Sequence, residues 1–351
     1  MSTLKVDGIR HNNATSDAIT MASDGTCSAK LTSVGGGQLS NRNIIINPEF
    51  KIWQRGTSWS SGVNRYVMDR WYQWGYNAIP SQITGTNGSQ YGVRLRHNSS
   101  TSNSFSAWSS TLEKKDIFHT IGKHLVLSFW MRKGSAFTGG MSCQIVARTD
   151  SESKINSGTN VTIGNQDIAG SLTTDWQKFT IKTTQVVPTT EVVGVNFWHH
   201  TTSGTDANNY FELNQVQLEV GDTATSFEHR TYTDELLRCQ RYFTYVPSGT
   251  VFPGRGNSGS SYIYSYQSTV PMRVSPTIGV SNDIAHGTFG VRRYRDNTGI
   301  SDSTSTPTTS STYFSPNSNM IHLVQGGFSG ADDRSATLFV SGGAITIDAE
   351  L

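Results

Sequence analysis

Short runs of β-branched and aromatic side chains dominate the middle of this sequence, and they most constrain its fold. Clusters of Gly, Asn, Ser and Thr separate the runs, as turns separate strands. The strands predicted here are Val67–Tyr76, Tyr91–His97, Phe105–Ser109, Leu125–Arg132, Gln144–Thr149, Trp176–Thr183, Val192–Trp198 and Tyr210–Val220. Strands at this spacing predict an antiparallel β-sandwich rather than an α/β fold.

The composition narrows the possible partners. Charged residues make up 15% of the 351 residues and the formal net charge is +2, so we expect no nucleic acid partner. Aromatic residues make up 10%, which distinguishes the chain from a disordered one. No run approaches the ~18 apolar residues of a membrane span, so no membrane insertion is expected. The first residues lack an apolar core, so we also expect no secretory signal and synthesis in the cytoplasm.

Residues 1–40 form a separate, strand-rich piece. Three alternating segments, Leu4–Ile9, Ala18–Met21 and Cys27–Thr32, precede the glycines at 35–37, which are typical of a flexible linker. Strands this short bury too little apolar area to fold alone. Either they dock on the rest of the chain or they pair with identical copies. The linker and the balanced charges favour pairing in an intertwined stem.

Three further parts follow this anchor. Residues 41–230 are predicted to form the sandwich, whose last strand shows a slip in alternation between Leu213 and Val216 that fits a bulge. Residues 231–245 contain one predicted helix, with Thr233 as its cap. Residues 246–351 are predicted to be a smaller β domain.

Several motifs for catalysis or metal binding are weak or missing. Cys27, Cys143 and Cys239 include no C-x-x-C pair, so they are interpreted as unpaired packing residues. The glycines at 254–259 match G-x-G-x-x-G, but a strand pattern follows them, so a loop is expected and not a nucleotide site. His199 and His200 are adjacent on a predicted strand and should point to opposite faces. With no G-x-S-x-G motif either, we expect no enzyme and no cofactor.

Motifs scattered between residues 4 and 278 resemble bacteriophage tail-fibre proteins of the marine and cyanobacterial type. Residues 4–9 and 18–25 resemble the N-terminal segments of those fibres. Residues 43–56 (NIIINPEFKIWQRG) and the D-R-W at 69–71 are similar to the opening of their jelly-roll domains. Residues 216–230 resemble the closing strand of that domain. Residues 235–243 and 270–278 resemble the helix and strand that follow.

The resemblance implies an all-β, trimeric fibre with a jelly-roll sandwich related to carbohydrate-binding domains. It implies a component of the virion tail that is assembled in the host cytoplasm. Its N-terminal segment would dock on other tail or virion proteins, and it would attach to a host-surface glycan without cleaving it. Two alternatives stay open: a purely structural tail, adaptor or capsid protein, and a glycan depolymerase.

Aromatic rings are the candidate sugar-binding residues, because sugars stack their C–H faces on such rings. Tyr72, Trp74 and Tyr76 should share one strand face, with Trp71 on the other, and Trp59 and Trp108 could form a second platform. Core packing is the alternative interpretation for each ring. These candidates are Trp71, Tyr72, Trp74, Tyr76, Trp59 and Trp108.

Two acidic residues are candidates for a structural calcium ion. Glu49 stands at the opening of the predicted jelly roll and Glu212 on its closing strand. Related carbohydrate-binding modules often hold Ca²⁺ through acidic residues at such positions, by oxygen ligands. The paired aspartates typical of those modules are replaced here by Leu213 and Asn214, so the resemblance supports this ion weakly.

Overall fold

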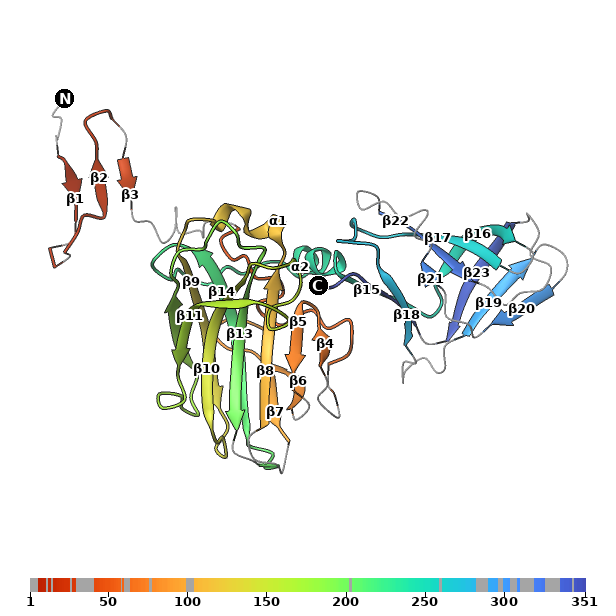
Figure 1. Cartoon of the computed structure of the whole chain (residues 1–351), viewed down its shortest axis with the longest axis horizontal. Helices are drawn as coiled ribbons and strands as arrows, with labels where there is room; N and C mark the ends of the chain where they lie inside the picture. Colours follow the sequence, from red (N-terminus) through yellow and green to blue (C-terminus); the bar gives the residue numbers. More distant parts are fainter. Residues whose placement is uncertain are drawn as a thin grey trace.

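Strands make up most of the computed structural model of the chain (Figure 1). The structure describes residues 6–10, 12–13, 15–25, 27–29, 41–57, 59, 64–75, 78–98, 104–201, 204–258, 261–281, 290–295, 299–303, 308–309, 319–325, 335–342 and 344–351. The strands pair antiparallel in several sheets, as the sequence predicted. Within these ranges, no helix has the length and apolarity that crossing a bilayer requires.

A small antiparallel sheet precedes the sandwich. Its strands, in spatial order, are β1 (Gly8–Ile9), β2 (Ile19–Met21) and β3 (Cys27–Ala29). Figure 1 shows this sheet at the N-terminal end, apart from the sandwich. The side chains of Ile9 and Met21 are 52% and 38% exposed. These strands are therefore present, although each is shorter than the predicted segment.

Two sheets pack face to face in the middle of the chain. The six-stranded sheet has the order β11 (Asn160–Asp167), β10 (Gly140–Arg148), β13 (Val192–Thr201), β8 (Ser104–Leu112), β5 (Trp71–Trp74) and β4 (Arg65–Met68). The five-stranded sheet has the order β12 (Gln177–Lys182), β9 (Leu125–Lys133), β14 (Tyr210–Val220), β7 (Tyr91–His97) and β6 (Ala78–Thr84). From β8 onward the chain passes repeatedly from one sheet to the other, which gives a jelly-roll sandwich.

Alternation along the strands fills the space between the sheets. Trp71, Trp108 and Phe197 come from the six-stranded sheet, and Phe129 and Phe211 come from the other. All five side chains are fully buried, and the Trp71 and Trp108 rings stack with centroids 6.3 Å apart. Since neighbouring residues on a strand point to opposite faces, the residues between these rings lie on the outer faces.

The first predicted strand, Val67–Tyr76, is wrong, because this segment is a hairpin. β4 and β5 pair with each other, and Asp69 and Arg70 form the turn between them. Arg70 has a φ of 67°, which is unusual for a residue with a Cβ atom. Its side chain is buried and forms an ion pair with Glu350. Tertiary contacts thus hold a turn for which the local sequence has no glycine or proline.

The helices are few and short. In the described ranges they are α1 (Lys114–Ile117), the 3₁₀ turn η1 (Phe118–Thr120) and α2 (Tyr232–Gln240). α2 is the predicted linking helix, but its cap is Thr231 and not Thr233. The Oγ1 of Thr231 accepts a hydrogen bond of 3.2 Å from the backbone N–H of Asp234. Cys239 and Tyr242 at its end pack against Ile46 and Ile52 of the sandwich.

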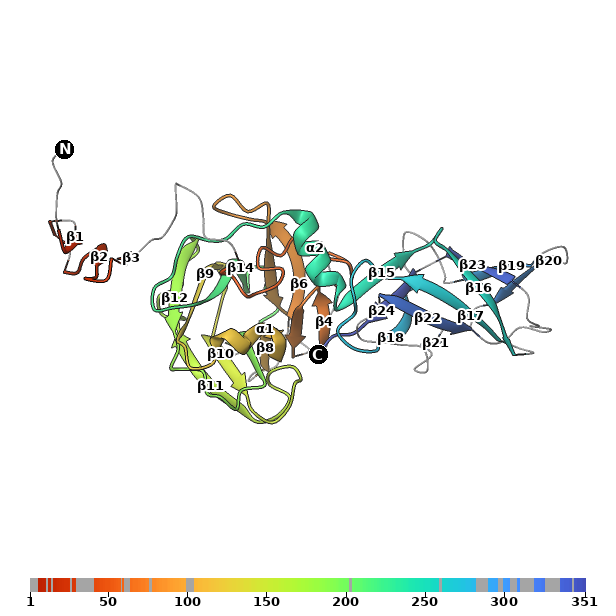
Figure 2. The ribbon, with the colours of Figure 1, turned by 90° about the horizontal axis from the view of Figure 1, so that it is seen from above.

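The C-terminal part has two sheets around its own apolar core (Figure 2). The three-stranded sheet has the order β15 (Phe243–Pro247), β24 (Ala344–Asp348) and β18 (Thr277–Ser281). The seven-stranded sheet has the order β20 (Gly299–Ser303), β19 (Gly290–Arg295), β23 (Ser335–Gly342), β16 (Val251–Ser258), β17 (Ser261–Gln267), β22 (Met320–Gln325) and β21 (Thr308–Thr309). The prediction of a loop at residues 254–259 is therefore wrong for residues 254–258, because they belong to β16.

Candidate functional site

Strand register arranges the outer face of the six-stranded sheet in rows. In one row Tyr72 pairs with Ser109, Ser109 with Asn196, and Asn196 with Gln144. In the next row Trp74 pairs with Ala107, Ala107 with Trp198, and Trp198 with Ser142. Both rows point away from the core, because the residues between them face the other sheet.

Trp74 lies at one end of this face. Its ring contacts that of Tyr72 with centroids 4.6 Å apart, and its Nε1 donates a 3.0 Å hydrogen bond to Ser109 Oγ. Lys154 places its Nζ 5.0 Å from the Tyr72 centroid and 5.9 Å from that of Trp74. The indole is partly exposed. It therefore forms a fixed aromatic surface with a cation beside it.

Trp198 lies on the other side of Ala107. Its ring stacks on Phe105, with centroids 4.8 Å apart, and on His200, with centroids 5.3 Å apart. Phe105 is 39% exposed and His200 is also exposed. Two strand spacings separate Trp74 from Trp198, which places their backbones ~10 Å apart. The fully buried Ala107 leaves space between the two indoles.

Polar groups line the face beside these rings. Asn196 is fully buried, and its Nδ2 donates to Gln144 Oε1 at 3.1 Å. The Oδ1 of Asn196 and the Nε1 of Trp198 are also buried, and neither has a hydrogen-bond partner among the described residues. An unpaired buried acceptor and donor cost free energy until a ligand or water satisfies them. The face therefore combines aromatic surfaces with polar groups, of which Gln144 is partly exposed.

The segment 149–159 covers the remainder of the face. Ile155 packs on Val146 and Val192, and its backbone N–H donates to Thr111 Oγ1 at 3.1 Å. A Cβ atom on Gly194 would lie 2.8 Å from Ile155, so this approach requires glycine. The buried Arg148 holds the same segment through Asp150 and the Lys154 carbonyl. These contacts fix the position of Lys154 beside Trp74.

The structure corrects part of the predicted aromatic set. Trp71 and Trp108 are fully buried in the core, so they expose no face to a ligand. Trp59 is partly buried at the core's edge, with Arg65 3.9 Å from its centroid and its Nε1 donating to the Val67 carbonyl. Tyr72 and Trp74 lie on one face as predicted. Tyr76 lies outside the described residues.

Cationic side chains already pair with both carboxylates of the predicted calcium site, Glu49 and Glu212. Glu212 is fully buried, and Arg94 and Arg132 donate to it at 2.7 and 2.5 Å. Glu49 pairs with the Lys51 ammonium at 2.6 Å. No cluster of three or more metal-ligating side chains occurs in the described ranges.

The electrostatics of Glu49 agree with this conclusion. Burial alone would raise its pKa, but Lys51, Ser89 and His229 outweigh burial and hold the pKa below its usual value. The Ser89 hydroxyl lies 2.7 Å and His229 Nδ1 2.9 Å from the carboxylate. The glutamate therefore stays ionised within a hydrogen-bonded network that ties residues near both ends of the sandwich together.

The residues of the site that lie on β13, and Phe105 beside them, were not among the predicted site residues. Asn196, Trp198 and His200 alternate along β13, and this period of two was the available signal. His199 is fully buried and His200 exposed, which confirms that these neighbours point to opposite faces. Phe105 lies in a predicted strand, but its position beside Trp198 depends on the pairing of β8 with β13.

Comparisons with known proteins found structural likeness only. No protein family and no curated protein matches the chain. Bacteriophage CBA120 tailspike protein 4 (enzymatically active domain) shares 13% identity at a TM-score of 0.36, over 54% of this chain and 24% of that one. A promiscuous carbohydrate-binding module of the β-sandwich superfamily shares 11% identity at a TM-score of 0.37, over 57% of this chain and 71% of that one. The CBM22-1–GH10 modules of Clostridium thermocellum xylanase 10B, complexed with xylohexaose, share 12% identity at a TM-score of 0.33. The match covers 54% of this chain and 30% of that one. These TM-scores are too low to support an inference of function.

Proposed function

We propose that this chain is a bacteriophage tail-fibre protein that binds a host-surface glycan without cleaving it. The observation that carries the glycan proposal is the pair Trp74 and Trp198, which stand on either side of Ala107 on one sheet face. Two indoles at this spacing suit the apolar faces of sugar rings in one chain. The partly exposed Gln144 and the exposed His200 on the same face would read hydroxyl groups beside the indoles.

The tail-fibre part of the proposal is supported by the sequence motifs. Residues 43–56 and 69–71, which resemble the fibre jelly-roll opening, enclose the buried Asn47. The Nδ2 of Asn47 donates to the Ile52 carbonyl at 2.8 Å and to the Asp69 carbonyl at 3.1 Å. Asn47 also has a φ of 57°. The resembling residues thus hold the corner from which the six-stranded sheet begins.

A trimer is the assembly we propose. Strands β1–β3 contain two or three residues each, and sheets this small are marginal alone. The exposed Ile9 and Met21 would be buried if three copies intertwined there. Three weak glycan sites would then act together, because linked sites share a high effective concentration. Light scattering should give about three times the 38.4 kDa chain mass, and a stable monomer would contradict the trimer.

A glycan array with the full chain tests the central proposal. We expect saturable binding to a subset of oligosaccharides and no release of reducing ends from them. A protein that only bridges virion parts would bind no glycan on the array and would be recovered with particle proteins. Release of reducing ends would favour a depolymerase over reversible attachment.

A further inference from the structure

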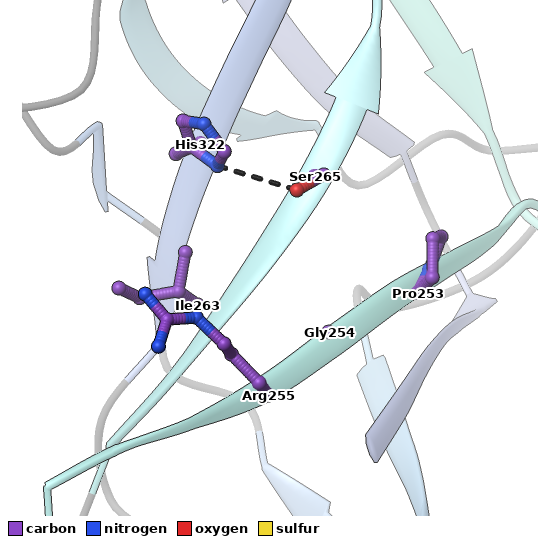
Figure 3. A pocket seen from close by; sticks show the side chains of 6 residues that line it. All are labelled: Pro253, Gly254, Arg255, Ile263, Ser265 and His322. Atoms are coloured by element: carbon purple, nitrogen blue, oxygen red, sulfur yellow. Dashed lines mark hydrogen bonds between the residues drawn. The ribbon is translucent and has the colours of Figure 1, made fainter. Parts of the chain in front are cut away.

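The C-terminal β domain contains a pocket to which the sequence assigned no role. Its volume is about 270 Å³, and it is open on the outer face of the seven-stranded sheet (Figure 3). Strands β16, β17 and β22 supply its lining residues, which are Pro253, Gly254, Arg255, Ile263, Ser265 and His322. It belongs to a different domain from the outer face that carries Trp74 and Trp198.

Strand register gathers the polar lining residues. Arg255 pairs with Ile263 across β16 and β17, and Ser265 pairs with His322 across β17 and β22. Positions two apart on β17 share a face, so all four side chains lie on the same side of the sheet. The opposite side carries the buried Tyr264. A Cβ atom on Gly254 would lie 2.3 Å from the Tyr264 ring, so glycine is required at this point of β16.

The described polar side chains of the pocket are those of Arg255, Ser265 and His322. Ser265 Oγ lies 3.2 Å from His322 Nδ1, and Figure 3 shows the two groups facing each other. Arg255 is exposed, and no ion pair or hydrogen bond to it is found in the described ranges. Among the described residues that line the pocket, none is acidic. Guanidinium groups match carboxylate and phosphate oxygens through two parallel N–H bonds.

We propose that this pocket binds the oxyanion of an acidic sugar, either a carboxylate or a phosphate. Arg255 binds the anion, and the hydrogen-bonded Ser265–His322 pair supplies one further donor to it. Pro253 and Ile263 provide an apolar wall of the kind that contacts a sugar ring. This site is independent of Trp74 and Trp198, so the chain would recognise two different chemical features of a glycan surface.

Calorimetric titration of the full chain tests this site with two probes, sodium glucuronate and glucose 6-phosphate. We expect saturable binding of at least one probe, weakened about tenfold or more in Arg255→Met and less in Ser265→Ala. Preference for glucuronate identifies a sugar acid as the source of the anion, and preference for glucose 6-phosphate identifies a phosphorylated sugar.

The matched control is Arg96→Met, which removes the same charge from β7 of the sandwich. It should leave binding unchanged, and all variants should melt at the wild-type temperature. Absence of saturable binding of both probes would overturn the proposal, as would an equal loss in Arg96→Met. Trp198→Ala should not affect either probe, so failure of this site is distinguishable from failure of the glycan face on the sandwich.

Discussion

Arg70 and Glu350 form a buried ion pair although 280 positions separate them in the sequence. Their side chains are 1% and 4% exposed. The Arg70 guanidinium also lies 3.5 Å from the centroid of the Tyr242 ring. One side chain from the β4–β5 turn therefore contacts the end of the linking helix and the last residues of the C-terminal domain. This contact joins the sandwich to the part of the chain that follows it.

Replacing Glu350 by glutamine should destabilise the protein, because it leaves the Arg70 charge buried and unpaired. The expected loss in the free energy of unfolding is about 3 kcal/mol. Urea denaturation followed by tryptophan fluorescence measures it. The control Asp175→Asn removes an exposed carboxylate and should change stability by less than about 0.5 kcal/mol. Equal stabilities of the two variants would show that the pair contributes nothing.

His199 should make the protein sensitive to acid. Burial lowers its pKa to about 4 from the ordinary histidine value of 6.5, and its Nε2 donates to the Thr138 carbonyl at 2.8 Å. Between these pH values the unfolded chain binds a proton that the folded chain does not. Stability therefore falls as pH falls from 6.5 to 4, by about 3 kcal/mol for this group.

The variant His199→Leu isolates that contribution. Asp69 acts in the opposite direction, because burial raises its pKa to about 6 and its protonation favours the folded state as pH falls. The wild type and the variant share Asp69, so the difference between their unfolding curves reports His199. This difference should shift in favour of the variant between pH 6.5 and 4. A difference independent of pH would contradict a neutral buried histidine.

The two thiols whose burial is described should be unreactive in the folded protein. Cys143 and Cys239 are fully buried and unpaired, and burial raises the pKa of each well above its usual value. In a Cys27→Ser background, a thiol reagent should detect neither cysteine before urea is added and both afterwards. Rapid labelling of either thiol in the native protein would show that it is accessible.

Lys154 should contribute to glycan binding through its place beside Tyr72 and Trp74. Lys154→Met keeps the apolar part of the side chain and removes its charge. We expect a loss of affinity of about threefold for anionic glycans and less for neutral ones, because the cation attracts negative charge. Titrations at low and high salt check this, and the loss should shrink as salt rises. An equal loss for both glycan classes would indicate a steric effect.

Local pattern predicted most strands of the sandwich, because alternation and turn residues are local signals, but it missed β6 and β11. The slip between Leu213 and Val216 predicted a bulge, and the register of β14 against β9 does shift between Asn214 and Gln217. The turn at Arg70 was missed because Glu350 and Tyr242, far along the chain, hold it. Only part of the outer face was predicted. Trp74 was a predicted sugar-binding residue, but its partner Trp198 was not, because the sequence does not reveal the register that brings β13 beside β8.

The most direct test of glycan binding compares Trp198→Ala with Phe118→Ala. Phe118 is 77% exposed on η1 and belongs to neither row of the outer face, so the second variant removes an exposed aromatic ring that is not part of the proposed site. The measurement is the Kd, by calorimetry, for the oligosaccharide that binds best on the array. We predict about a tenfold or greater loss of affinity in Trp198→Ala, with an unchanged melting temperature, and wild-type affinity in Phe118→Ala. Wild-type affinity in Trp198→Ala would contradict the proposed glycan site.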